Sequence, residues 1–318
     1  MKKMAKEFNH VSVLLNECIE GLDIKPNGVY VDATLGGAGH SMNILKRLSD
    51  NGKLYCFDKD IEAINVAKER LDKISKNYQI IHADFSNLKK ELNTLGVEKI
   101  DGILFDLGVS SYQFDTPERG FSYKYDARLD MRMDQSQKLS AYEVVNSYSK
   151  EALTRIFFEY GEERFAKQIS AKICKAREQS PIETTFQLVD VIKDSLPSYI
   201  LNQKGHPAKQ VFQAIRIEVN GELVSLSSAM EQALDMLDIN GRLAVITFHS
   251  LEDRIVKNMF KKATCTNDNV KGLASLKDNE QEFELVNRKV ITSTEEELEN
   301  NNRAHSAKLR IIKRVKRG

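Results

Sequence analysis

Residues 27–41 read NGVYVDATLGGAGHS and constrain the fold of this chain more than any other segment. A short apolar run leads to Asp32, and a glycine-rich turn then opens an amphipathic segment that begins at Ser41. A strand, a glycine turn and a helix start in this order are typical of the phosphate- or nucleoside-binding corner of doubly wound α/β folds. Glycine permits positive φ values and lets a ligand approach the backbone closely. Many dinucleotide and nucleoside binders share this pattern, so the rest of the chain must distinguish between them.

Short apolar segments alternate with helical patterns in the first third of the chain. The expected strands are residues 29–31, 53–57, 79–82 and 100–105, and the expected helices lie within 10–25, 61–71 and 88–95. This alternation predicts a doubly wound, mostly parallel α/β sheet with helices on both faces. Ligands of such sheets bind at the carboxyl ends of the strands. Each expected strand is followed by an acidic residue or a glycine turn, which agrees with a site at that edge.

The pattern changes at about Gly120. Residues 125–134 alternate strictly between apolar and charged side chains, which predicts an extended segment with one charged face. Helical patterns follow at 150–160, 163–178 and 185–196, and Thr184 or Thr185 is the expected N-cap of the last. We therefore predict a mainly helical inserted domain at 120–205, between two parts of a main domain at 1–119 and 206–318.

The main domain resumes at His206-Pro207 with a helix, since proline suits the first turn of a helix. A fifth strand is expected at 242–248, a closing strand at 308–315, and a long loop with some short helix at 264–306. Ser250 and Asp253 follow the fifth strand with the spacing of a helix N-cap motif.

Composition and charge narrow the function only slightly. The formal net charge of +1 argues neither for nor against a nucleic-acid partner, and the basic last eleven residues are more commonly a solvated tail than a phosphate contact. The chain has no apolar run near the roughly 20 residues of a membrane span. It also lacks the apolar segment of a signal peptide, so we expect a cytoplasmic protein without membrane contact. Four widely spaced cysteines predict neither a disulfide framework nor a metal site.

Two candidate ligand contacts follow the second and third expected strands. Asp58 comes roughly 20 residues after the glycine turn, the spacing at which a carboxylate binds the ribose hydroxyls of a nucleoside. It could instead be an exposed acid at a strand end. Phe85 follows the third strand, where its ring could stack on adenine or simply belong to the core.

The candidates for chemistry lie further along the chain. Asp106 and Ser110 follow the fourth strand, where a reacting group could bind, although serine turns usually only cap backbone groups. His249 follows the fifth strand and is either catalytic or structural. Lys209 and Arg216 share a helix face, which is either a solvated surface or, for a nucleic-acid substrate, a set of phosphate contacts.

Beyond these single residues, eight longer motifs resemble the bacterial RsmH (MraW) family of ribosomal small-subunit RNA methyltransferases. They span about His10 to Arg310 and read, in order, GAGHS, DLGVSSYQFD, ERGFSY, LDMRMD, YGEERFAKQI, HPAKQVFQAIRI, TFHSLEDRIVK and NNRAHSAKLR. The resemblance implies a class I, Rossmann-like methyltransferase fold and S-adenosylmethionine as cofactor. It implies as substrate the N4 amine of a decoding-centre cytidine in the 16S ribosomal RNA of the small subunit.

The resemblance also implies residue roles. By position in the motifs, the cofactor contacts fall on Ala38, Gly39, His40, Asp58, Phe85, Asp106 and Gln113. The role of His40 comes from the resemblance alone. Ala38 stands where the family frequently has glycine, which is tolerable unless that position needs a positive φ; Tyr112 replaces a usual proline and His305 a usual arginine. The inserted domain is implied to help recognise RNA, with Arg132, Lys209 and Arg216 as candidate substrate contacts.

The expected reaction is a direct attack of the cytosine N4 on the methyl carbon, helped mostly by positioning and desolvation. Asp106, Ser110 and His249 are the candidate catalytic residues, and the identity of any base stays open. Three other classes stay open as well: a nicotinamide-dependent oxidoreductase, a non-catalytic ribosome-binding factor and a small-molecule methyltransferase. The sequence is compatible with a monomer or a dimer.

Overall fold

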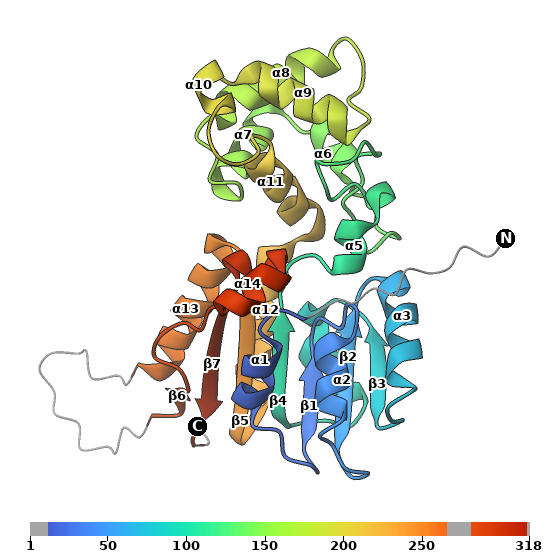
Figure 1. Cartoon of the computed structure of the whole chain (residues 1–318), viewed down its shortest axis with the longest axis vertical. Coiled ribbons are helices and arrows are strands. Elements are labelled where there is room, and N and C mark those ends of the chain that lie inside the picture. Colours follow the sequence, from blue (N-terminus) through green and yellow to red (C-terminus); the bar gives the residue numbers. More distant parts are fainter. Residues whose placement is uncertain (1–11, 266–280, 317–318) are drawn as a thin grey trace, which may run out of the picture. The chain divides into compact units, whose positions relative to one another are not determined.

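The computed structural model describes residues 12–265 and 281–316. The chain divides into two compact units, which Figure 1 colours along the sequence. The sheet unit comprises Met1–Gly108 and Val224–Gly318, and the helical unit comprises Val109–Leu223. The predicted boundaries, 119/120 and 205/206, made the helical insertion too short. Helix α11 (Lys209–Asn220) belongs to the helical unit because its buried side chains, including Val211 and Ile215, form part of that unit's core.

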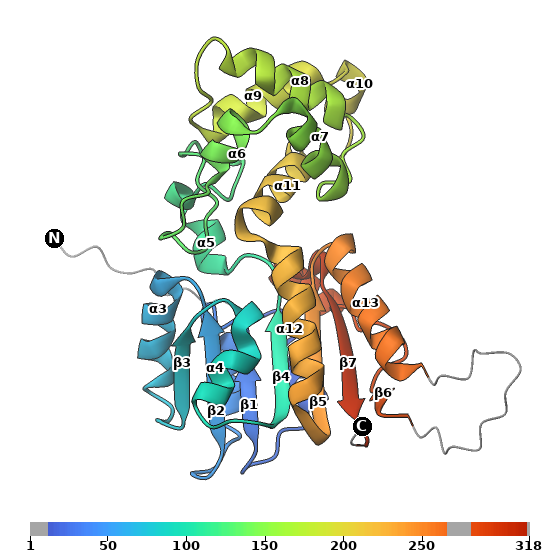
Figure 2. The same ribbon diagram turned by 180° about the vertical axis from the view of Figure 1, so that it is seen from behind.

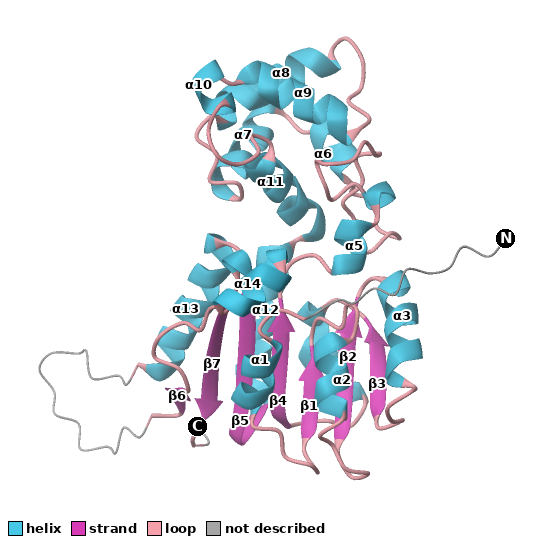
Figure 3. Cartoon of the chain, in the orientation of Figure 1, coloured by secondary structure: helices cyan, strands magenta, loops and turns pink. Residues whose placement is uncertain are grey.

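The sheet unit is built on a single seven-stranded sheet in the order β3-β2-β1-β4-β5-β7-β6. The strands are β1 (Val29–Asp32), β2 (Lys53–Asp58), β3 (Tyr78–His82), β4 (Ile100–Asp106), β5 (Leu237–Thr247), β6 (Phe283–Leu285) and β7 (Lys308–Arg314). Strands β1 to β5 pair in parallel, and β7 pairs antiparallel with both β5 and β6. Figure 3 shows these strands side by side. The predicted doubly wound, mostly parallel sheet is confirmed.

The chain changes direction across the sheet between β3 and β4. Strand β1 pairs with β2 on one side and with β4 on the other, so its carboxyl end lies at the point where the strand order reverses. Open α/β sheets bind ligands at this point. The glycine loop leaves β1 there, and Asp106 is the last residue of β4.

Helices cover both faces of the sheet because successive strand residues point to opposite sides. Tyr30 and Leu104 join one core with α1 (Leu15–Leu22), α2 (Gly39–Leu45) and α3 (Ile61–Leu71). On the other face, Val31 and Ile103 join a core with α4 (Leu88–Thr94), α12 (Glu222–Met236) and α13 (Ser250–Thr264). Figures 1 and 2 show these two layers in turn, with α1 and α2 in front in the first and α4 and α12 in front in the second.

Three local differences from the sequence-based expectations appear in the sheet unit. Helix α12 was not predicted, although its residues form an amphipathic pattern next to α11. Strand β5 begins at Leu237 and not at residue 242, with an irregular register against β4 that the turn at Asn240-Gly241 accommodates. The predicted loop at 264–306 contains β6, α14 (Glu295–Asn300) and the one-turn helix η3 (Asn302–Ser306). Residues 266–280 of it lie outside the described residues.

The helical unit packs its helices around one core of its own. In chain order they are α5 (Ser111–Asp115), η2 (Pro117–Arg119), α6 (Ala141–Ser147), α7 (Lys150–Glu159), α8 (Ala166–Arg177), α9 (Thr185–Ser195), α10 (Ser198–Leu201) and α11. Thr184 is the N-cap of α9, because its side chain accepts a hydrogen bond from the amide of Gln187. In the described parts of the chain, no helix is long and apolar enough to cross a membrane.

The alternating segment 125–134 is a loop and not a strand. Its alternation does describe burial, since Leu129, Met131 and Met133 are buried while the charged residues between them are only partly covered. The prediction of an extended segment was wrong because Met131 has φ 59°, outside the β region, and because the segment forms a single isolated β-bridge, between Arg128 and Thr184, instead of a strand.

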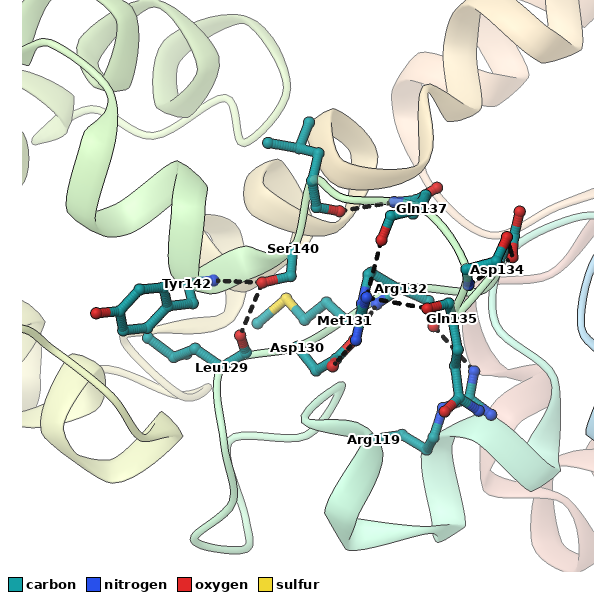
Figure 4. Close-up of polar contacts among 12 residues, drawn as sticks. Arg119, Leu129, Asp130, Met131, Arg132, Asp134, Gln135, Gln137, Ser140 and Tyr142 are labelled. Atoms are coloured by element: carbon teal, nitrogen blue, oxygen red, sulfur yellow. Dashed lines mark hydrogen bonds and ion pairs between the residues drawn. The ribbon is translucent and has the colours of Figure 1, made fainter.

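Figure 4 shows how the charged residues close this loop. The guanidinium of Arg132 pairs with both carboxylate oxygens of Asp130, at 2.8 and 2.7 Å, and donates further hydrogen bonds to the carbonyls of Gln135 and Gln137. Arg119 reaches the carbonyls of Arg132 and Met133 from below the loop in this view. The charged face therefore holds the loop together instead of facing a neighbouring strand.

Candidate functional site

The loop between β1 and α2 is held by a carboxylate from the neighbouring strand. Asp58, at the end of β2, accepts hydrogen bonds from the amides of Gly36 (2.8 Å) and Asp60 (2.9 Å). Gly36 has φ 47°, a conformation that glycine adopts without strain. Arg70 of α3 donates a hydrogen bond of 2.7 Å to the carbonyl of Gly37 in the same loop. Burial raises the pKa of Asp58 to about 6, so the carboxylate is ionised near pH 7 and above.

A second carboxylate, which the sequence analysis did not single out, joins the ends of β1 and β4. Asp32 is buried and accepts hydrogen bonds from the Ser41 hydroxyl (2.6 Å) and the Thr34 amide (3.1 Å). The Thr34 hydroxyl in turn accepts from the amide of Asp106 at 2.7 Å. Asp32 and Thr34 thus fix the glycine loop against the strand end that carries Asp106. The position of Asp32 at the end of the first predicted strand could have identified it as a site residue from the sequence.

The turn into α2 explains two of the predicted contact residues. Ala38 has φ 65°, so this position does require the left-handed conformation. An alanine there carries a strain of roughly 1–2 kcal/mol that glycine would avoid. A Cβ atom on Gly39 would lie only 1.9 Å from the hydroxyl oxygen of Ser12, which is buried against it. Gly39 is therefore required by the close approach of the N-terminal segment.

His40 lies in the first turn of α2 with its ring buried. Its Nε2 is 3.1 Å from the carbonyl oxygen of Val13, and its Nδ1 is 3.5 Å from Oδ2 of Asp106. Burial lowers the pKa of His40 to about 4, so the ring is neutral at pH 7 and forms no ion pair with Asp106. Because a carbonyl oxygen can only accept, the proton lies on Nε2 and the lone pair of Nδ1 faces the carboxyl group.

Asp106 carries a buried oxygen atom whose hydrogen-bonding capacity is not satisfied. Its Oδ1 is buried and has no hydrogen-bond partner among residues 12–265 and 281–316. Burial, followed by the charges of Asp32 and Glu252, raises the pKa of Asp106 to about 8. A protonated Asp106 matches the Nδ1 lone pair of His40, which needs a donor. Buried polar atoms almost always have partners, so the unpartnered Oδ1 fits a ligand that brings a donor or a positive charge.

Phe85 and His249 border the same edge of the sheet unit. Phe85 packs edge-on against Phe105 of β4, with ring centroids 5.6 Å apart, and is only half-buried, so it belongs to the core and still offers part of its surface. His249 is the N-cap of α13. Its Nδ1 accepts from the amide of Glu252, and its Nε2 lies 3.0 Å from a Glu252 carboxylate oxygen. The predicted N-cap at Ser250 was therefore one residue late.

The remaining candidates belong to the helical unit. Ser110 and Gln113 form a reciprocal capping box at the start of α5, which gives the Ser110 hydroxyl a structural task. Arg216 makes a two-pronged pair with Glu222 at 2.9 Å for both bonds, and Arg132 is held within its own loop. Both arginines are thus used inside the unit, and only Lys209 is an exposed cation of the predicted set.

The fold and the site together define a class of enzyme. Five parallel strands, an antiparallel β7 beside β5, and a glycine loop between strand-end acids are the arrangement of a Rossmann-like, class I methyltransferase. The family model described as the MraW methylase family matches residues 7–315. A curated relative, ribosomal RNA small subunit methyltransferase H of Streptococcus dysgalactiae subsp. equisimilis, is 55% identical over 99% of this chain and 100% of its own. The chain belongs to the MraW methylase family, and as such it is an S-adenosylmethionine-dependent methyltransferase.

Two solved structures are also similar to this chain. An rRNA methylase from Streptococcus thermophilus matches with a TM-score of 0.42 and 14% identity, covering 95% of this chain and 94% of its own. TrmN from Thermus thermophilus matches with a TM-score of 0.42 and 11% identity, covering 95% of this chain and 48% of its own. Family membership follows from the family model and the curated relative.

Proposed function

We propose that this enzyme methylates the N4 amine of a decoding-centre cytidine in the 16S RNA of the small ribosomal subunit. The main support is the 55% identity, over nearly the whole chain, to a relative named for methylation of small-subunit ribosomal RNA. The choice of base and atom rests on the family resemblance of the motifs. A ribosomal substrate also favours the cytoplasm as the place of action.

The proposed cofactor site lies in the sheet unit, where six of the seven predicted contact residues come from β1–α2, β2, the start of η1 (Phe85–Asn87) and β4. When bound, S-adenosylmethionine supplies an activated methyl group. Asp58 offers its remaining carboxylate lone pairs to the ribose hydroxyls, and Phe85 offers its uncovered surface to the adenine. Asp106 offers the unsatisfied Oδ1. These groups fit the cofactor, because carboxylate oxygens suit its ribose hydroxyls and its positive charge and an aromatic surface suits its adenine.

Catalysis is proposed to depend on positioning more than on a strong base. The cytosine amine is a weak nucleophile because its lone pair is delocalised into the ring, and a nearby acceptor would favour the reactive geometry. Asp106 is the leading candidate for that acceptor in the sheet unit, and His249 is a second candidate whose two ring nitrogens already face Glu252. Ser110 is the weaker candidate because its hydroxyl already caps α5. In the helical unit, we propose Lys209 as a phosphate contact and treat Arg132 and Arg216 as structural.

The test is methyl transfer from labelled S-adenosylmethionine to small ribosomal subunits from a strain that lacks this gene. Free ribosomal RNA is assayed in parallel, and nucleosides from both are analysed by mass spectrometry. N4-methylcytidine at one position is the expected product. Its absence from both substrates, with the cofactor bound, would refute the proposed substrate. A small-molecule methyltransferase is distinguished by salt, because binding of RNA phosphates weakens steeply as salt rises.

Gly39→Ala is expected to weaken cofactor binding by about tenfold. The new methyl group would stand where the Ser12 hydroxyl now lies, so either Ser12 or the first turn of α2 must move. The matched test is the double variant Ser12→Ala with Gly39→Ala, which removes the 1.9 Å contact and should recover most of the affinity. Calorimetric titration with S-adenosylhomocysteine measures both. Equal affinities of the single and double variants would contradict the steric explanation.

A further inference from the structure

Glu297 differs from its acidic neighbours in α14. Glu295 and Glu296 are exposed, whereas Glu297 is half-buried and its Oε1 accepts a hydrogen bond of 2.8 Å from the amide of Leu14. The two residues are 283 positions apart in the chain. Glu297 is itself oriented by Thr294, whose hydroxyl caps the helix by accepting from the Glu297 amide. A half-buried carboxylate with such a distant backbone partner indicates a specific tertiary role.

The hydrogen bond to Glu297 holds Leu14 at a position where its backbone is strained. Leu14 has φ 51°, a left-handed conformation that costs a residue with a Cβ roughly 1–2 kcal/mol, and its side chain is fully buried. Strained backbone of this kind persists where the surroundings over-determine it, and it gathers at functional sites. Glu297 and the burial of the leucine side chain together hold the segment Ser12-Val13-Leu14, here called the N-terminal strap.

The strap lies directly against the proposed cofactor loop. The Ser12 hydroxyl occupies the space beside Gly39 that a Cβ atom would need, and the Val13 carbonyl accepts a hydrogen bond from the Nε2–H of His40. This hydrogen bond decides which way the His40 ring faces and leaves the Nδ1 lone pair directed at Asp106. The negative charge of Glu297 and the bond to Val13 also oppose the lowering of the His40 pKa by burial. A continuous set of contacts therefore links α14 to Asp106.

We propose that Glu297 is a positioning residue for cofactor binding: through the N-terminal strap it orients His40, and through His40 it orients Asp106. The proposal rests on the cofactor site of the proposed function. In this proposal, the effect of Glu297 depends on its acceptor oxygen and on the length of its side chain, and not on its negative charge. The acceptor oxygen of Glu297 bonds the amide of Leu14, which is not one of the predicted cofactor contacts.

Two single substitutions distinguish the effect of the length of the Glu297 side chain from the effect of its charge. Glu297→Gln keeps an acceptor oxygen at the same distance along the side chain but removes the charge. Glu297→Asp keeps the charge but is one methylene shorter, so it cannot reach the Leu14 amide without moving α14. Glu296→Ala, on the exposed side of the same helix, controls for changes in helix stability.

The affinity of the full chain for S-adenosylhomocysteine is measured by calorimetric titration. Glu297→Asp should weaken it by about tenfold, whereas Glu297→Gln and Glu296→Ala should stay within about threefold of the unchanged protein. Equal affinities of the aspartate and glutamine variants would overturn the proposal. A loss in Glu297→Gln but not in Glu297→Asp would also overturn it, because charge and not reach would then matter.

A second readout needs no cofactor. In protein with ¹⁵N-labelled histidine, two-bond nitrogen–proton correlation spectra identify which ring nitrogen of His40 carries the proton. We expect the Nε2-protonated form in the unchanged protein and in Glu297→Gln, and a mixture of forms in Glu297→Asp. An unchanged His40 spectrum in Glu297→Asp would contradict the positioning role. If the unchanged protein itself fails to bind S-adenosylhomocysteine, the proposed cofactor site is wrong, which is a separate result from a failure of Glu297 alone.

Discussion

Asp106→Asn is expected to lose at least about tenfold in affinity for S-adenosylmethionine while its ligand-free form becomes more heat-resistant than the unchanged protein at about pH 9. The pKa of Asp106 is raised from 3.8 to about 8, mainly by burial. Between these two values, the folded protein holds a proton on Asp106 that the unfolded chain has already released. The asparagine amide can donate to Nδ1 of His40 as the protonated carboxyl does, but it cannot supply a negative charge to a cationic cofactor.

The sign of the pH effect follows from that raised pKa. The stabilising contribution of Asp106 is complete below its unfolded pKa of 3.8 and disappears as the pH rises through about 8. Between about pH 6 and pH 9, the melting temperature of the unchanged protein should therefore fall more than that of Asp106→Asn. Asp50→Asn, at an exposed aspartate, is the control. Parallel melting curves for the unchanged protein and Asp106→Asn would show that Asp106 is already ionised in the folded state.

Asp58→Ala is expected to raise the dissociation constant for S-adenosylmethionine by about tenfold or more. The substitution removes the proposed ribose acceptor and also the partner of the Gly36 and Asp60 amides, so the loop and the ligand contact are lost together. Calorimetric titration measures the change. Thermal unfolding of the ligand-free variant reports whether the sheet unit stays folded.

An analogue separates the two tasks of Asp58. S-adenosylhomocysteine lacking both ribose hydroxyls should bind the unchanged protein about tenfold more weakly than S-adenosylhomocysteine itself. Asp58→Ala should hardly distinguish the two ligands, because the coupled contact is already gone. If the variant still prefers the natural ribose by the same factor, Asp58 acts only on the loop.

The parts of the fold that depend on local patterns were predictable. Helix α3 has the predicted bounds, 61–71, because Asp60 caps it and its apolar period is regular. The five parallel strands and β7 lie where apolar runs end at acids, glycine turns or basic residues. The alternation at 125–134 was misleading, because side-chain burial can alternate in a loop as well as in a strand. Its Arg132–Asp130 pair closes the chain on itself.

The candidate site was predictable where motif position and strand ends agree. Asp58, Phe85 and Asp106 all come from the carboxyl edge of the sheet, as expected from the doubly wound pattern. Arg216 did not follow its pattern, because the helix face predicted for Lys209 and Arg216 says nothing about the carboxylates that other segments bring to it. Arg216 is occupied by Glu222, only six residues away, yet the pairing depends on the turn at Gly221 between two helices.

Short stretches of sequence were enough to predict the order of strands and helices along the chain, the glycine loop and the family. Each of these predictions uses patterns formed by residues that are near one another in the sequence. The chemistry of the site depends on contacts between distant parts of the chain. Glu297 reaches Leu14, Val13 binds His40, and the raised pKa of Asp106 comes from burial among charges on other elements. Desolvation and hydrogen-bond geometry exist only once those elements are packed, so no local pattern could have revealed that Asp106 holds a proton or that α14 orients it.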